Sequence, residues 1–226
     1  MNKTNFINNM AKGTKTAFFS LLLLLSSCFL SSCEEHDDRL VEPGNMIGNI
    51  WLSNNTYVTP EKYDPQTMEA VGVVFHVSQK RDTAYVVAIT EMGSLNYADS
   101  LANISGVSSS LTAYDGYTNT AALVNSDINC PGAQEARLYE SPLKSWFLPS
   151  ASELRKLHEN LRTVQVSMDI IGGDGFSDEQ YLSSSQDGSS DANSIINCYC
   201  VSLTSGYVIG SSKLVPHRVR PVLLVH

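Results

Sequence analysis

The residues whose chemistry is easiest to recognise lie near the amino terminus. The sequence Leu30-Ser31-Ser32-Cys33 follows an apolar run that begins at Ala17, and lysines at positions 3, 12 and 15 precede that run. A basic start, a short apolar core and small residues before a cysteine are typical of a lipoprotein signal peptide. We therefore expect removal of residues 1–32 and acylation of Cys33, which would anchor the protein in outer-membrane lipid.

Two alternatives to this interpretation stay open. The sequence Leu25-Ser26-Ser27-Cys28 also fits the lipidation box, but cleavage there would leave Phe29 and Leu30 exposed beside the anchor. The other alternative is an ordinary secreted protein, which loses both cysteines with its signal peptide. A membrane-spanning helix is not expected here, because the apolar run is shorter than the roughly 20 residues that a span requires.

Residues 33–45 are expected to form an acidic tether. The run Glu34-Glu35-His36-Asp37-Asp38 directly follows the cysteine, and a segment so charged cannot bury a core of its own. It resembles the acidic export signals that follow the lipidated cysteine in surface lipoproteins of Bacteroidetes. This resemblance implies a domain that faces the cell exterior.

The charge balance excludes one class of partner. The chain carries 15 basic and 23 acidic residues, and removal of residues 1–32 takes away three lysines and no acidic residue, so the net charge changes from −8 to −11. A chain this acidic lacks the basic stripe that neutralises phosphates, and we expect no nucleic-acid partner. The remaining 194 residues are enough for one domain, 46–226, with a sizeable core.

Cys130, Cys198 and Cys200 follow the anchor cysteine in the sequence. Three is an odd number, so at most one disulfide can form within the chain. Cys198 and Cys200 share one face of an expected strand and are poorly placed to bond to each other. Either Cys130 pairs with one of them, or all three are buried free thiols.

No catalytic pattern in the sequence is complete. The run His158-Glu159-Asn160-Leu161-Arg162 begins like a zinc protease motif, but Arg162 stands where the second histidine is required. Neither a Gly-x-Ser-x-Gly elbow nor a phosphate-binding glycine loop occurs. We therefore predict a protein that is not an enzyme and needs no cofactor or metal.

Calcium is an alternative that we do not favour. Carboxylate and amide oxygens of the kind that calcium prefers occur in two loops. The two sets are Asp174, Asp178 and Glu179, and Asp187, Asp191 and Asn193. Asp, Asn and Gly also serve turns, which explains both loops without a metal.

The polar loop 186–193 is the predicted binding surface. Short polar groups on a rigid scaffold can exchange hydrogen bonds with sugar hydroxyls or with a peptide. The candidate ligand-binding residues are Gln186, Asp187, Asp191, Asn193, Lys213 and His217.

The elements that must position these groups follow an α+β pattern. Apolar and alternating runs predict strands over residues 50–52, 57–58, 71–77, 84–89, 181–184, 195–203, 207–211 and 218–225. Within 195–203, Tyr199, Val201 and Leu203 are expected to form the core face. Residues 95–117 are expected to form a long surface loop and 172–177 an irregular segment.

Two or three helices are expected in addition. Short ones are predicted over 118–125 and 133–139. The clearest begins at Ser150, which forms a capping box with Glu153. Leu154, Leu157 and Leu161 then fall on one face at helical spacing.

The order of these motifs resembles one known family. The segments are 72–75, 114–120, 146–154, 175–177, 181–184, 203–206 and 219–222. Together they resemble the Fib-succ-major paralogous domain, which is grouped with the Lcl-type C-terminal domain and is common in Bacteroidetes lipoproteins. The resemblance covers residues 46–226 and implies a C-type-lectin-like fold related to formylglycine-generating enzymes. Arg220, in its last motif, is expected to make a structural ion pair or carbonyl contact.

These features together predict a non-catalytic binding module that recognises a glycan or a surface protein. One alternative, implied by the kinship with formylglycine-generating enzymes, is an oxidative enzyme that uses Cys198 and Cys200. A reactive thiol requires a positively charged neighbourhood, and residues 195–203 contain no cation. Another alternative is a structural component of a surface appendage, which would engage a partner through a sheet edge.

Overall fold

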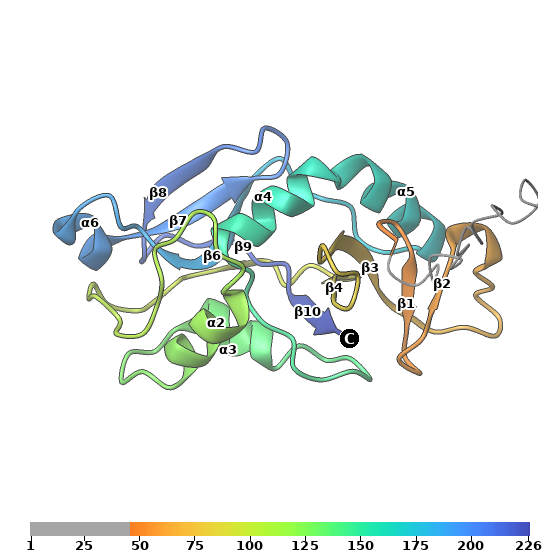
Figure 1. The fold of residues 1–226 in the computed structure, drawn as a ribbon. Helices are drawn as coiled ribbons and strands as arrows, with labels where there is room; N and C mark the ends of the chain where they lie inside the picture. Colours follow the sequence, from red (N-terminus) through yellow and green to blue (C-terminus); the bar gives the residue numbers. More distant parts are fainter. Residues whose placement is uncertain (1–45) are drawn as a thin grey trace, which may run out of the picture. The chain divides into compact units, whose positions relative to one another are not determined.

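Two five-stranded β-sheets organise residues 46–226, the part of the chain that the computed structural model describes (Figure 1). Five α-helices accompany the sheets, which confirms the predicted α+β class, although two or three helices were expected. The lipidation residue Cys33, the signal peptide 1–32 and the tether 33–45 lie outside the described residues. Among the described residues, no helix is long and apolar enough to cross a membrane.

The first sheet is antiparallel, with the order β10-β4-β3-β1-β2. Its strands are β1 (Ile50–Leu52), β2 (Tyr57–Val58), β3 (Ala70–Val77), β4 (Ala84–Ala88) and β10 (Val222–Val225). The nearly continuous apolar sequence of β3 and β4 suits central strands that are covered on both faces. The predicted hairpin at 53–55 is confirmed, with Asn55 in the left-handed region at a φ of 61°.

The second sheet is mixed, with the order β5-β9-β6-β7-β8 and a parallel pairing of β6 with β9. Its strands are β5 (Ser94–Leu95), β6 (Gln180–Gln186), β7 (Asn197–Ser202), β8 (Val208–Ser212) and β9 (His217–Arg218). The prediction of one strand over 218–225 is wrong. The chain leaves one sheet after β9 and enters the other at β10. Pro221 stands in this crossing, and it lacks the N–H that a continuous ladder needs.

The helices follow local signals of very different strength. They are α2 (Gly116–Val124), α3 (Pro131–Arg137), α4 (Ala151–Glu159), α5 (Leu161–Ile171) and α6 (Asp191–Ile196), with a 3-10 turn η2 (Pro60–Lys62). The capping box is confirmed, because Ser150 Oγ accepts from Glu153 N at 3.3 Å and Glu153 Oε2 accepts from Ser150 N at 2.8 Å. Helix α6 was not predicted, because its residues 191–193 were expected to be loop and 195–196 strand. It spans less than two turns and is capped by Ser190, whose Oγ accepts from Asn193 N at 3.1 Å.

Strand β7 separates two hydrophobic clusters, so the prediction of a single core face is wrong. Val201 and Leu203 pack in a cluster with α4 and α5, whereas Cys198 and Cys200 are fully buried in a second cluster on the other face. The second cluster also takes residues from the segment 95–117, which was expected to lie on the surface. Tyr97 in that segment is fully buried and donates its hydroxyl to Ser184 O at 3.0 Å. This segment is therefore irregular but partly internal.

Candidate functional site

The ammonium group of Lys213 is fully buried where three segments of the chain meet. Its Nζ donates to Ala102 O at 2.6 Å, Gln186 Oε1 at 2.7 Å and Ser194 O at 2.7 Å. It also lies 5.3 Å from the centroid of the Tyr97 ring, a cation–π distance. None of these partners carries a full charge, and burial lowers the pKa of Lys213 to about 8.

Gln186 completes this internal cluster. Its side chain is buried, its Oε1 accepts from Ile104 N at 2.9 Å, and its Nε2 donates to Asn103 Oδ1 at 3.1 Å. The structure thus brings two predicted ligand-binding residues, Gln186 and Lys213, into direct contact. Both side chains are engaged inside the protein, where they fasten the segment 101–104 to α6 and to the end of β8.

The other predicted ligand-binding residues lie around this cluster in different environments. Asp187 is buried and its Oδ1 accepts from Ser189 N at 2.9 Å. Burial alone would raise the pKa of Asp187, but hydrogen bonds from Ser189, Tyr199 and Asn197 outweigh it and leave that pKa lowered. Asn193 is half-buried and bonds to Ser189 Oγ at 2.8 Å, while Asp191 is exposed at the start of α6.

His217 lies on β9, on the far side of the β8–β9 connection from α6. Its Nε2 is 2.7 Å from Ser211 Oγ, and burial lowers its pKa. Of the six predicted residues, only Asp191, Asn193 and His217 therefore present atoms at the surface. A ligand role for these three stays a prediction.

The feature that sequence reasoning missed is an exposed apolar surface around Lys213. The segment of Ala102, the helix α6 of Ser194 and the segment of Lys213 itself each carry exposed aliphatic side chains, with 42% to 45% of their surface accessible. We call this surface the apolar tip; its residues are Leu101, Ile195, Ile196, Leu214 and Val215. Ile195 and Ile196 were predicted to begin the strand 195–203, a prediction that is wrong for these two residues. They lie instead in the helix α6, which the sequence did not predict, and both are exposed.

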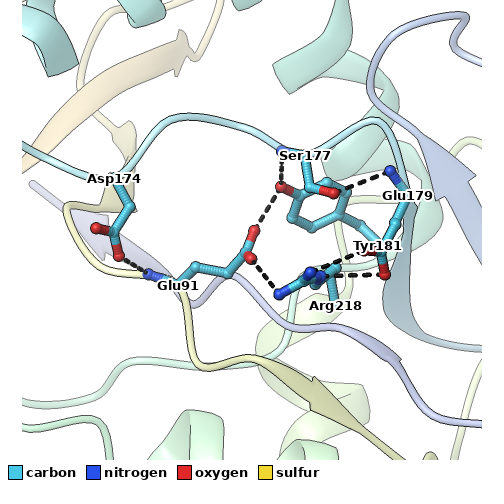
Figure 2. Close-up of polar contacts among 6 residues, drawn as sticks. All are labelled: Glu91, Asp174, Ser177, Glu179, Tyr181 and Arg218. Carbon is cyan, nitrogen blue, oxygen red and sulfur yellow. Dashed lines mark hydrogen bonds and ion pairs between the residues drawn. The ribbon is translucent and has the colours of Figure 1, made fainter.

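A second polar cluster lies between the two sheets and the loop 172–179 (Figure 2). Tyr181 Oη donates to Glu91 Oε1 at 2.5 Å and accepts from Ser177 N at 2.7 Å. Arg218 bridges Glu91 at 3.1 Å and Glu179 at 2.8 Å. Burial and the bond to Glu91 raise the pKa of Tyr181, and the bond to Arg218 lowers that of Glu179. The cluster holds the loop in place with bonds among its own members.

The candidate calcium ligands of this loop are engaged by protein donors. Asp174 Oδ2 accepts from Glu91 N at 2.9 Å, and Asp178 Oδ1 accepts from Thr204 Oγ1 at 3.0 Å. Within residues 46–226, no group of three or more His, Cys, Asp or Glu side chains is arranged to hold a metal ion. Asp174 and Asp178 thus help to hold the loop 172–179 in place, and independence from calcium stays a prediction.

Arg220 makes the carbonyl contacts that were expected of it. The side chain is buried, with Nε donating to Ala88 O at 2.7 Å and Nη2 donating to Ile89 O at 3.1 Å and Asp174 O at 2.9 Å. Its guanidinium carbon lies 4.7 Å from the centroid of the Phe176 ring. This residue joins the end of β4 to the loop 172–179.

A cleft of about 560 Å³ lies between α4, α5 and this loop. Most small-molecule sites are such hollows with a few convergent polar groups. Here, however, His158 Nδ1 already pairs with Leu203 O at 2.6 Å, and Asp178 pairs with Thr204. These two polar side chains of the wall are turned to the protein. Two more, Gln165 and Glu159, bond to Asp169 and Lys156, so few polar groups of the cleft are left for a ligand.

The three cysteines are buried free thiols, which decides between the alternatives that their number left open. Hydrogen bonding to Cys198 and burial raise the pKa of Cys200, and burial raises that of Cys130. A cation does lie near them, because the ammonium of Lys213 interacts electrostatically with Cys198 and Cys130. It comes from another part of the sequence, which explains why the segment 195–203 gave no sign of it.

No protein-family model matches this chain, and no curated protein is significantly similar to it. The resemblance to Fib-succ-major domains therefore rests on the motifs in the sequence and stays a prediction.

Proposed function

We propose that this protein is a non-catalytic recognition module, anchored at the outer membrane through acylated Cys33, that binds a surface protein with its apolar tip. The observation that carries the proposal is that the buried ammonium of Lys213 joins its own segment, 213–215, to the segment 101–104 and to α6, and that each of these carries exposed aliphatic side chains. A contiguous apolar surface with a polar rim is typical of an interaction site.

The chemistry of the tip favours a protein partner over a glycan. All five of its side chains are aliphatic, and aliphatic groups gain free energy mainly by being removed from water. Sugars offer hydroxyls instead, and the polar groups expected to bind them are partly used within the protein, as with Gln186 and Lys213. Exposed Asp191 at the start of α6 supplies a polar rim.

The state of the cysteines supports a role without catalysis. A nucleophilic thiol needs a depressed pKa and access to its substrate. Cys130 and Cys200 are fully buried with raised pKa values. An oxidative enzyme that uses Cys198 and Cys200 stays the alternative. The proposal also includes a C-type-lectin-like fold, a domain that faces the cell exterior and binding that is independent of calcium.

Selection from a peptide library tests the proposed surface. A random peptide library displayed on phage is panned against the chain without its signal peptide. Selected peptides are then tested on the variant Ile195→Asp/Leu214→Asp and on the matched control Leu138→Asp. Leu138 is also aliphatic and is 71% exposed. The proposal expects a loss of at least tenfold in affinity for the tip variant and none for the control.

A glycan array read with and without EDTA decides between ligand classes. Two results together would overturn the protein-partner proposal in favour of a lectin. One is glycan binding that is lost when Asp191 and Asn193 are replaced by Ala. The other is peptide affinity that is the same for the tip variant as for the unchanged protein. Dependence on calcium would appear as a signal that EDTA abolishes.

A further inference from the structure

A second exposed apolar surface lies where the described chain begins. Met46, Ile47, Val166 and Ile170 are 53%, 37%, 55% and 47% exposed. They line one hollow of about 530 Å³ together with Pro60, Glu61 and Arg162. We call these four apolar residues the α5 face.

The α5 face is a fixed surface rather than a loose chain end. Ser167 Oγ of α5 donates to Gly48 O at 2.6 Å, and Gly48 N donates to Val74 O at 2.8 Å. These bonds fasten the start of the domain between α5 and β3. The side chains of Met46 and Ile47 therefore keep their place beside Val166 and Ile170.

The position of this face relative to the predicted anchor identifies its partner. Residues 34–45 separate Cys33 from Met46, and even fully extended these twelve residues reach only about 40 Å. The predicted anchor is thus tied to the end of the domain that carries Met46, which it keeps within about 40 Å of the bilayer. Figure 1 shows α6, with the apolar tip, at the left end of the ribbon and β1 and β2, with α5 beside them, at the right.

We propose that the α5 face rests on the phospholipid surface and so holds the apolar tip away from the membrane. This inference rests on the lipid anchor of the proposed function. An apolar face at an interface buries its side chains at the boundary between head groups and acyl chains. Arg162 and Glu61 line the same hollow, where the guanidinium suits a lipid phosphate and the carboxylate suits a head-group ammonium.

The anchor makes a small contact area sufficient. Four exposed side chains would bind lipid only weakly from solution. A tethered domain already experiences a high effective concentration of lipid, so the contact needs only to favour the docked orientation over the others. A tenfold preference is enough to orient most molecules with the tip outward.

Depth-dependent quenching tests the inference. The chain from residue 34 onward carries an amino-terminal hexahistidine and is held on phosphatidylethanolamine–phosphatidylglycerol vesicles that contain a nickel-chelating lipid. An environment-sensitive fluorophore is attached through Val166→Cys, or through Tyr207→Cys as the control. Tyr207 is 75% exposed and lies on the connection between β7 and β8. The native cysteines 130, 198 and 200 are buried.

Brominated lipids should quench the probe at position 166 at least twofold more than the probe at 207. The additional change Met46→Asp/Ile170→Asp should abolish that difference. Equal quenching at both positions, or stronger quenching at 207, would overturn the inference. So would a concentration-dependent blue shift at 166 without vesicles, because a second copy would then cover the face. Attachment by hexahistidine makes the result independent of acylation, which the intact mass of the cell-derived protein reports separately.

Discussion

The substitution Lys213→Met tests most sharply how the apolar tip is built. Methionine fills a volume similar to that of the lysine stem, so the change removes the ammonium without opening a large cavity. Three hydrogen bonds from the ammonium are lost, to Ala102 O, Gln186 Oε1 and Ser194 O. Gln186 Oε1 keeps its bond from Ile104 N at 2.9 Å, whereas the two carbonyl oxygens lose the donor that Lys213 provided.

The expected loss of stability follows from two opposing terms. Bonds from a charged donor contribute about 1.5–3 kcal/mol each, which gives about 4.5–9 kcal/mol for three. Burial lowers the pKa of Lys213 from 10.5 to about 8. At about 1.36 kcal/mol per pKa unit, this shift corresponds to about 3.4 kcal/mol of desolvation cost. The variant has no buried ammonium and avoids that cost. We therefore expect Lys213→Met to lower the free energy of unfolding by about 3 kcal/mol, or Tm by about 6–12 °C.

Urea unfolding at several pH values measures the loss of unfolding free energy in Lys213→Met and the direction in which that loss changes with pH. The folded pKa lies below the unfolded one, so ionised Lys213 opposes folding at pH 7. Between pH 8 and 10.5 the native amine is neutral while the unfolded one is still protonated, so wild-type stability should rise relative to the variant. The control Lys144→Met, at an exposed lysine, should stay within about 0.5 kcal/mol of wild type. A loss below about 0.5 kcal/mol at Lys213, or a flat difference from pH 7 to 9.5, would refute the reasoning.

Three further predictions concern buried groups away from the tip. Burial raises the pKa of Glu153 to about 7, so the native state holds a proton that the unfolded state releases above pH 4.5. The free energy of unfolding of the wild type should therefore fall by about 3 kcal/mol from pH 4.5 to 7 relative to Glu153→Gln. Urea unfolding curves across that range measure the difference. Arg220→Lys cannot reproduce the bonds to Ala88, Ile89 and Asp174 and should cost about 2–4 kcal/mol in the same assay; an unchanged midpoint would show that the carbonyls need no guanidinium. Thiol titration of residues 34–226 should find no fast-reacting group in the native protein and three in guanidinium chloride, whereas one fast native thiol would favour the oxidative enzyme.

Local signals in the sequence predicted the elements that depend on neighbours in the chain. The capping box of Ser150 and Glu153 located α4, and the turn at 53–55 located the first hairpin, because the partners lie within eight residues of one another. Helix α6 was missed because it is six residues long and its two isoleucines continue the apolar run of β7.

The apolar tip could not be predicted from the sequence, because it depends on contacts between residues far apart in the chain. Lys213 reaches Ala102 across 111 residues of sequence, and no pattern near either residue indicates that contact. The same holds for the split of 218–225 between two sheets, which depends on the pairing of β9 with β5 and β6 and of β10 with β4. The sequence therefore predicted polar ligand-binding residues, of which Gln186, Asp187 and Lys213 are internal, and gave no sign of the exposed aliphatic side chains of the tip.

Site-specific photo-crosslinking on intact cells tests the central claim most directly. Benzoylphenylalanine replaces Ile195 in the apolar tip or Leu138, which is 71% exposed elsewhere on the domain, and cells that display the full chain are irradiated. The account predicts an adduct with a discrete protein at position 195, none at 138, and loss of the adduct when unlabelled domain competes. Equal adducts at both positions, or none at 195, would contradict it.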